Sequence, residues 1–487
     1  MRRMRFPQLG AGALLALALS VLAAVPRASL ERPAAVSDNP SSSIVFVQAP
    51  IVAAGNPIDC FPKGSRLVLL DPGKSAGKVI PLTGGFFAAR DPQVSFDGSR
   101  ILFSARKTRN ARWQIWEMNT GGAAKRQVTH CAGDCLGPAY LARGQFVYTE
   151  VETQSPGANS RVFVAQLDGS EVRPITFGPG DFRVETVLRD GRILVSASSP
   201  LLGGPEASGS RQLYTVRLDG TALAAFRCDH RERAVRDQAT ELDDGSLVFV
   251  KAHGGEEVGG QLAEIRRGAL HNSALTRPQG IFLSPRANGS QKLIVARKNP
   301  SPRGSAAKFD LYAFDSAREE FGVLIYEDRK LSSVQAVPVA PRPIPRWFWS
   351  IVKPESEAGY FICLNSHLSS DAPHGRMETP IAQVRVLTLD PQSNHEKVLG
   401  IAPVEKDGSF YIAVPPDRPM RFELLSAEGR VIRAQRSWIW TRPGEEAACV
   451  GCHEDKAMAP PNRWPQVLRR LDTPVHLGVE PAMQAAH

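Results

Sequence analysis

The 487-residue sequence has few cysteines and few aromatic residues, and beyond residue 28 it has no apolar run long enough to cross a bilayer. Seven Cys are too few for a disulfide scaffold. The aromatic residues (7%) are not interleaved with the basic clusters, so the net charge of +10 does not indicate a nucleic-acid partner. A balance of 43% hydrophobic and 22% charged residues excludes wholesale disorder and collagen-like repeats.

Residues 1–28 are typical of a signal peptide. Arg2, Arg3 and Arg5 precede a stretch rich in Ala and Leu, and small residues at Ala24 and Ala28 offer cleavage sites. The apolar stretch is short for a membrane span, and an uncleaved anchor is the alternative interpretation. We therefore expect an exported, periplasmic protein with no membrane span in its mature chain.

A repeat runs through most of the chain. Gly (41) and Pro (38) make up about 16% of the residues, above the average of about 12%, which indicates many turns and a β-rich fold. One unit of strand, polar turn and strand recurs with starts 46 to 51 residues apart, at Val68–Thr83, Gln114–Thr129, Arg161–Thr176, Gln212–Arg227, Gln261–Thr276 and Asp310–Ile325. A second hairpin lies between these copies, with turn glycines at Gly98, Gly144, Gly191, Gly245 and Gly289.

Two hairpins per repeat give four strands, which predicts an all-β, six-bladed propeller over residues 40–340. Ile44–Val47 paired with Val334–Val339 would complete the sixth blade. A tandem of β-sandwiches is the alternative, although it would not need so regular a period. The phrase SFDGSRILFSAR resembles the repeats of TolB-type periplasmic propellers over about Ser65–Ile325, which implies a fold and a binding platform rather than an activity.

A second domain follows a Pro-rich linker at residues 340–346. The run Val404–Ile432 alternates apolar and polar residues around Asp-Gly and Glu-Gly turns, as the strands of a half-buried sheet do. We assign residues 346–435 to a small β-sandwich-like domain, which resembles the carboxypeptidase-regulatory kind.

The sequence Cys449-Val450-Gly451-Cys452-His453 is C-x-x-C-H, the attachment motif of c-type haem. Two thiols at this spacing add across the two haem vinyl groups, and the next residue presents an imidazole to the iron. Composition alone would produce the pattern about 0.002 times per chain. We therefore predict one covalently attached haem c in the segment 436–487, bound by Cys449 and Cys452 with His453 as the proximal iron ligand.

Three other uses of a C-x-x-C pair stay open. They are a thioredoxin-like redox pair, a zinc half-site and a plain disulfide hairpin. No βαβ pattern surrounds the motif and no second C-x-x-C is present, so haem attachment is favoured.

The distal iron ligand is less constrained. His476 has a longer tether than Met458 and is the candidate, while a surface histidine and an open sixth position are the alternatives. Only 34 residues follow His453, so a haem would pack on the preceding β-domain. Trp438 and Trp440 are natural packing partners, or else ordinary core residues.

Five further cysteines remain: Cys60, Cys131, Cys135, Cys228 and Cys363. Five is odd, so at least one is unpaired within the chain. Cys131 and Cys135 flank Ala-Gly-Asp and could close a short disulfide. Cys228 precedes Asp229 and His230, which form a metal corner or, as we favour, a loop.

The runs APVEKDGSFYIAVPPDRPMRFELLSAEGRVI and RSWIWTRPGEEAACVGCHEDKAMAPPNR resemble the middle domain of the hydrazine synthase alpha subunit and its relatives. The resemblance implies a c-type haem at the edge of a β-domain beside a TolB-like propeller. In that family a second haem domain follows, and a Tyr shortly after the motif His takes part in haem ligation. Here Glu454–Met458 contains no Tyr and the chain has one C-x-x-C-H, so hydrazine synthesis itself is not implied.

These observations predict an exported monohaem c-type protein that acts in electron transfer or in small-molecule redox chemistry, with nitrogen compounds as one possibility. Its partner would be a redox protein or a small-molecule substrate, with docking on the propeller face. The alternative is a propeller interaction protein in which the haem is structural or absent.

Overall fold

The computed structural model describes residues 42–479, apart from 51, 53–59, 73–77, 153–158, 199–209, 227–233, 253–257, 267–268, 270, 278–279, 300–307, 370–371, 373–374, 391–392, 394, 436 and 453–461. The expected signal peptide, Cys228 and His453 therefore lie outside the described residues. Asp38–His487 forms one compact unit. None of the described helices is long and apolar enough to cross a membrane.

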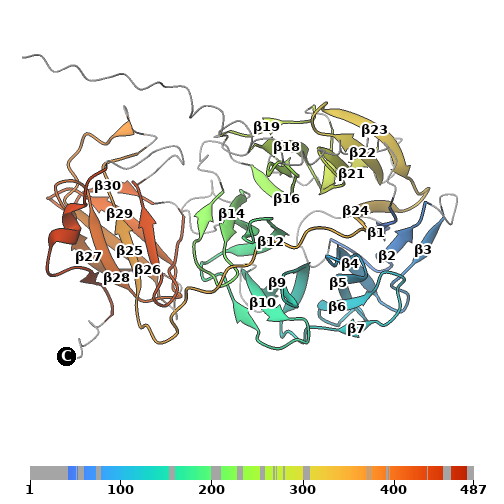
Figure 1. The fold of residues 1–487 in the computed structure, drawn as a ribbon, viewed down its shortest axis with the longest axis horizontal. Helices are drawn as coiled ribbons and strands as arrows, with labels where there is room; N and C mark the ends of the chain where they lie inside the picture. Colours follow the sequence, from blue (N-terminus) through green and yellow to red (C-terminus); the bar gives the residue numbers. More distant parts are fainter. Residues whose placement is uncertain are drawn as a thin grey trace, which may run out of the picture. The chain divides into compact units, whose positions relative to one another are not determined.

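The described residues form an all-β fold without an α-helix, and up to Pro338 their strands make six sets of four, which follow one another around a common centre (Figure 1). The first three sets are β24 (Ser332–Pro338), β1 (Ile44–Ala49), β2 (Arg66–Leu70) and β3 (Val79–Pro81); β4 (Ala88–Val94), β5 (Arg100–Arg106), β6 (Gln114–Asn119) and β7 (Arg126–Gln127); and β8 (Asp134–Tyr140), β9 (Gln145–Glu152), β10 (Asn159–Gln166) and β11 (Arg173–Pro174).

The next three sets are β12 (Asp181–Val187), β13 (Ile193–Ser198), β14 (Gln212–Val216) and β15 (Ala224–Ala225); β16 (Val235–Glu241), β17 (Leu247–Ala252), β18 (Gln261–Ile265) and β19 (Ser273–Ala274); and β20 (Phe282–Ala287), β21 (Lys292–Lys298), β22 (Phe309–Asp315) and β23 (Glu320–Tyr326). Each set is antiparallel within itself. A single parallel bridge between Ser160 and Asp181 joins the third and fourth sets into one sheet.

The ring closes through strands from its two ends, as the repeat predicts. β1 pairs antiparallel with β24, with Val45 opposite Val337 and Val47 opposite Val334. All six residues of β1 are buried. The first set therefore takes three strands from the start of the propeller and one from its end.

Repeated hydrogen bonds explain the recurrent glycines and threonines. The five turn glycines of the inner hairpins, which follow Asp, Asn or Arg, all have the positive φ that a tight hairpin turn requires. In four sets the threonine that ends the 16-residue unit accepts a hydrogen bond from a backbone N–H on the third strand. The pairs, as N–H and Thr Oγ1, are Leu67–Thr83 (2.9 Å), Ile115–Thr129 (2.8 Å), Val162–Thr176 (2.9 Å) and Leu262–Thr276 (3.0 Å).

The second domain is a sandwich of two four-stranded sheets. One sheet has the order β31 (Glu446–Cys449), β25 (Gly359–Cys363), β28 (Phe410–Val414) and β32 (Val475–His476); the other has β27 (Glu396–Pro403), β26 (Gln383–Leu389), β29 (Met420–Leu425) and β30 (Val431–Ala434). The two sheets bury a shared core that includes Phe361, Val384, Ile412 and Leu424. The short 3-10 helix η2 spans Gln466–Arg469.

The sandwich extends beyond residue 435, the end that the sequence predicted for it. β31 and β32, both from the segment expected to form a separate haem attachment tail, are the two outer strands of the first sheet, and both pair in parallel with their neighbours. The motif cysteines therefore belong to the sandwich and not to an independent tail.

Candidate haem attachment site

The motif begins at the end of an edge strand. Cys449 is the last residue of β31 and lies opposite Cys363 in the parallel pairing with β25. Beyond the strand the pairing continues, because the N–H of Leu364 donates to the carbonyl of Cys449 (2.8 Å) and the N–H of Asn365 donates to that of Val450 (3.1 Å). The edge of the sheet thus fixes the backbone of the first half of the motif.

The second half of the motif is held against the turn that follows β25. The N–H of Cys452 donates to the carbonyl of Leu368 at 3.0 Å. At Gly451 a Cβ atom would lie 2.6 Å from that same carbonyl oxygen, closer than real Cβ contacts come. Glycine at the second variable position, directly before Cys452, is therefore what allows the motif to close on residue 368.

The two motif cysteines are partly exposed. Cys449 and Cys452 are both half-buried and pack on the margin of the sandwich core. The disulfide among the described residues joins Cys131 to Cys135, so neither motif cysteine takes part in it. Two half-buried cysteines on a sheet edge, with two residues between them, fit the covalent attachment of a haem, and the imidazole of His453 lies outside the described residues.

His476, the expected distal ligand, is not brought together with the described part of the motif. It lies on β32, across three strand spacings, or about 14 Å, from β31. Its partner Ala413 lies opposite Tyr360, whereas Cys449 lies opposite Cys363. Tyr360 and Cys363 are three residues apart on one strand and face opposite sides of the sheet. His476 and Cys449 therefore lie at opposite edges and on opposite faces.

Two clefts lie beside the turn that holds the motif. One, of about 690 Å³, is lined by residues that include Leu364, Asn365 and Trp464. The other, of about 640 Å³, is lined by residues that include His367 and Met377. Both clefts share Arg376 and Lys406, so positive charge lies between them.

His367 directly precedes Leu368, whose carbonyl accepts the hydrogen bond from the N–H of Cys452. Among the described histidines it is therefore the one connected most directly to the motif through backbone hydrogen bonds. Its side chain is buried, with 8% exposed. Burial and the positive charge of Arg376 lower the pKa of His367, so that its imidazole is neutral at pH 7. A neutral imidazole is the form that binds a metal.

His367 was not predicted as a site residue from the sequence. The run Cys363–Gly375 contains one cysteine and two histidines, and this density of ligand residues was the available signal. What the sequence could not provide was the backbone pairing that brings residues 364–368 alongside the motif.

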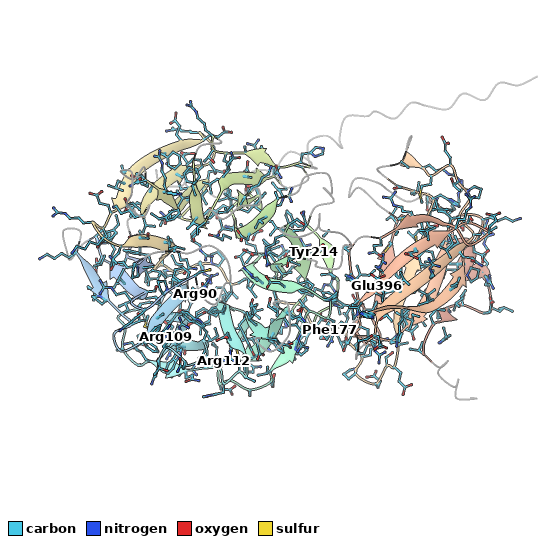
Figure 2. The ribbon with its side chains drawn as sticks, turned by 180° about the vertical axis from the view of Figure 1, so that it is seen from behind. Arg90, Arg109, Arg112, Phe177, Tyr214 and Glu396 are labelled. Atoms are coloured by element: carbon cyan, nitrogen blue, oxygen red, sulfur yellow. A yellow bond between two sulfur atoms is a disulfide. The ribbon has the colours of Figure 1, made fainter. Side chains whose placement is uncertain are left out.

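The two tryptophans upstream of the motif are buried and contact other parts of the chain. Trp440 packs edge-on against Phe177 and Phe182 of the propeller, and its indole N–H donates to the carbonyl of Gly220 at 2.9 Å (Phe177 is labelled in Figure 2). Trp438 is buried beneath the guanidinium of Arg421. Trp438 is a buried core residue, as the second interpretation has it, whereas Trp440 packs into the core of the propeller instead of the sandwich.

The fold and the motif define an all-β protein in which a ring of four-stranded sets precedes a β-sandwich with C-x-x-C at its edge. Residues 366–454 match the family described as the hydrazine synthase alpha subunit middle domain. The resemblance inferred from the sequence around the motif is thereby confirmed.

Two comparisons extend over most of the chain. Hydrazine synthase subunit alpha of Kuenenia stuttgartiensis is 24% identical across 85% of this chain, which spans 66% of that subunit's length. The solved structure of Kuenenia stuttgartiensis hydrazine synthase matches with a TM-score of 0.76 and 21% identity, covering 88% of this chain and 71% of that one. The fold therefore extends across the propeller and the sandwich.

TolB-like propellers are also among the structural neighbours. TolB from Acinetobacter baumannii matches with a TM-score of 0.45 and 14% identity, over 61% of this chain and 66% of that chain.

Proposed function

We propose that this chain is an exported monohaem c-type protein, related to the hydrazine synthase alpha subunit, whose six four-stranded sets are the blades of a propeller. It acts in electron transfer or in small-molecule redox chemistry, and its resemblance to a hydrazine synthase subunit favours nitrogen compounds. The observation that supports this best is the C-x-x-C pair on a sheet edge, half-buried and closed by Gly451 against the turn at Leu368.

In this proposal each part of the site has one task. Cys449 and Cys452 form the thioethers, and His453 supplies the proximal imidazole. Arg376 and Lys406 supply positive charge that complements the two propionates of the porphyrin. The bound haem would supply one-electron redox chemistry at its iron, with a potential set by axial ligation and burial.

For the distal position we propose His367 in place of His476. It is neutral, buried and one residue from the carbonyl that binds the N–H of Cys452. A six-coordinate iron with two imidazoles suits electron transfer, whereas a vacant position admits small ligands.

The first experiment asks whether haem is covalently attached. The full chain is produced in cells with a working cytochrome c maturation system, separated by denaturing electrophoresis and stained for haem. The unaltered chain is expected to stain, C449S to retain at most one thioether, and C449S/C452S to lose the stain. C60S is the matched control and keeps it. An unaltered chain without stain refutes the proposal and favours a propeller interaction protein.

The second experiment identifies the distal ligand. Absorption spectra of the reduced protein are recorded with and without carbon monoxide. The unaltered chain is expected to be six-coordinate and slow to bind carbon monoxide, and H367A to bind it rapidly, while H476A behaves like the unaltered chain. Rapid binding by the unaltered chain would contradict ligation by His367 and would favour an open, catalytic iron.

A further inference from the structure

The innermost strands of the six sets line a central channel of about 680 Å³. In five of them the register slips at a residue with positive φ: Asp91, Gly137, Gln238, Ser284 and Gln335. The sixth strand, β12, bulges at Glu185. Four of the five are not glycine, and such conformations cost about 1–3 kcal/mol each, so the surrounding wall must enforce them.

Hydrogen bonds between neighbouring strands provide this enforcement. Asp91 N–H donates to Gln335 Oε1 (2.9 Å), and Gly137 N–H donates to Asp91 Oδ2 (3.1 Å). On the other side of the ring, Ser284 N–H donates to Gln238 Oε1 at 2.8 Å. The polar groups at this level are therefore fixed before any ligand arrives.

Three of the four arginines that line the channel pair with a carboxylate. Arg90, which Figure 2 labels, pairs with Asp91 at 2.9 Å. Arg183 and Arg211 both pair with Asp181.

Arg286 is different. Among the residues that the structure describes, no carboxylate lies within ion-pair distance of its guanidinium, and its neighbour is the side-chain amide of Gln93, whose oxygen accepts at 3.1 Å when turned toward it. Burial lowers the pKa of Arg286.

Two acids face this region, Glu185 and Asp237. Burial and the charge of Asp237 raise the pKa of Glu185 to about 7, and burial raises that of Asp237. Burial therefore disfavours the charged form of both acids. The positive charges of Arg183 and Arg211 reduce the repulsion between the two carboxylates, and Arg286 attracts the carboxylate of Glu185. Among the four arginines that line the channel, Arg286 is therefore the one without a carboxylate partner in the described part of the chain.

We propose that the channel is a binding site for a small monocarboxylate, which pairs with the guanidinium of Arg286. The planar guanidinium matches a carboxylate through two parallel hydrogen bonds. The channel volume is that of small-molecule sites. This site is separate from the haem attachment site and does not depend on it.

Acetate is the probe and acetamide, of the same shape without the charge, is its control. Both are titrated calorimetrically into the full chain at pH 6.5 and constant ionic strength. Acetate is expected to bind with one site per chain and acetamide at least tenfold more weakly. R286Q is expected to weaken acetate binding at least tenfold. R286K is expected to weaken it at least threefold, because an ammonium cannot make the two parallel hydrogen bonds of a guanidinium. R318Q, at an exposed turn, is the control and should leave acetate binding unchanged.

Three results would overturn the proposal. They are equal binding of acetate and acetamide, acetate binding unchanged in R286Q, and binding of methylammonium that disappears in E185Q, which would make the channel a cation site. If circular dichroism shows that R286Q does not fold, the proposal is still tested by the comparison of acetate with acetamide on the unaltered chain and by the R286K titration.

Discussion

The threonine that ends the 16-residue repeat offers a sharp test of what stabilises each set of strands. Thr176 is fully buried, and its Oγ1 accepts the N–H of Val162 on β10, which is also fully buried. Thr176→Val keeps the shape of the side chain and removes the acceptor. The Val162 N–H then has no partner in a site without access to water.

A buried donor without a partner costs about 1–3 kcal/mol, and relief of hydroxyl burial offsets part of that cost. We expect Thr176→Val to lower the free energy of unfolding by about 1–2 kcal/mol. In a domain of this size the change corresponds to a melting temperature about 2–6 °C lower. Thr176→Ser, which keeps the acceptor, should cost less than Thr176→Val.

The assay is thermal unfolding by circular dichroism together with amide hydrogen exchange at Val162. Thr108→Val, at an exposed threonine, is the control and should leave both readouts unchanged. The reasoning is refuted if Thr176→Val melts at the same temperature as the unaltered chain, the Val162 amide keeps its protection from exchange, and Thr176→Ser is less stable than Thr176→Val.

Three further predictions concern the motif, the channel and the ring. Gly451→Ala places a Cβ 2.6 Å from the carbonyl of Leu368 and should reduce covalent haem yield several-fold in the staining assay, whereas Gly84→Ala, in open space, should not; equal yields would contradict the close approach. The folded pKa of Glu185, about 7, exceeds its usual value of 4.5, so its stabilising contribution is complete below pH 4.5 and is lost as the pH rises through 7. E185Q should therefore melt above the unaltered chain at pH 8 and close to it at pH 4.5, and a constant difference across this range would refute the assignment. Deleting residues 44–49 removes the partner of β24 and should abolish the cooperative melt of the propeller, which a small, uniform loss of stability would disprove.

The propeller could be predicted from the sequence because the signals of its repeat are local. The Asp-Gly turns, the alternating apolar residues and the terminal threonines each act within about 16 residues, and the period of about 50 residues then specified the pairing of β1 with β24.

The outer strands of the sandwich could not be predicted from the sequence in this way. Glu446–Cys449 and Val475–His476 are short, carry no clear alternation and pair in parallel with strands far away in the sequence. A side chain such as His367 becomes part of the candidate site only through that pairing. The sequence therefore identified the motif cysteines, while their surroundings required the fold.

The way the ring closes has a consequence for the newly made chain. β1 is synthesised first, but one of its edges waits for β24, because Val45 pairs with Val337 about 290 residues later. At about 5–20 residues per second, translation alone leaves that edge open for roughly 15–60 s. An apolar strand with one unpaired edge can add a strand from another chain. Nascent chains that stop before Ser332 should therefore aggregate through Ile44–Ala49, and a holding chaperone would find its target there.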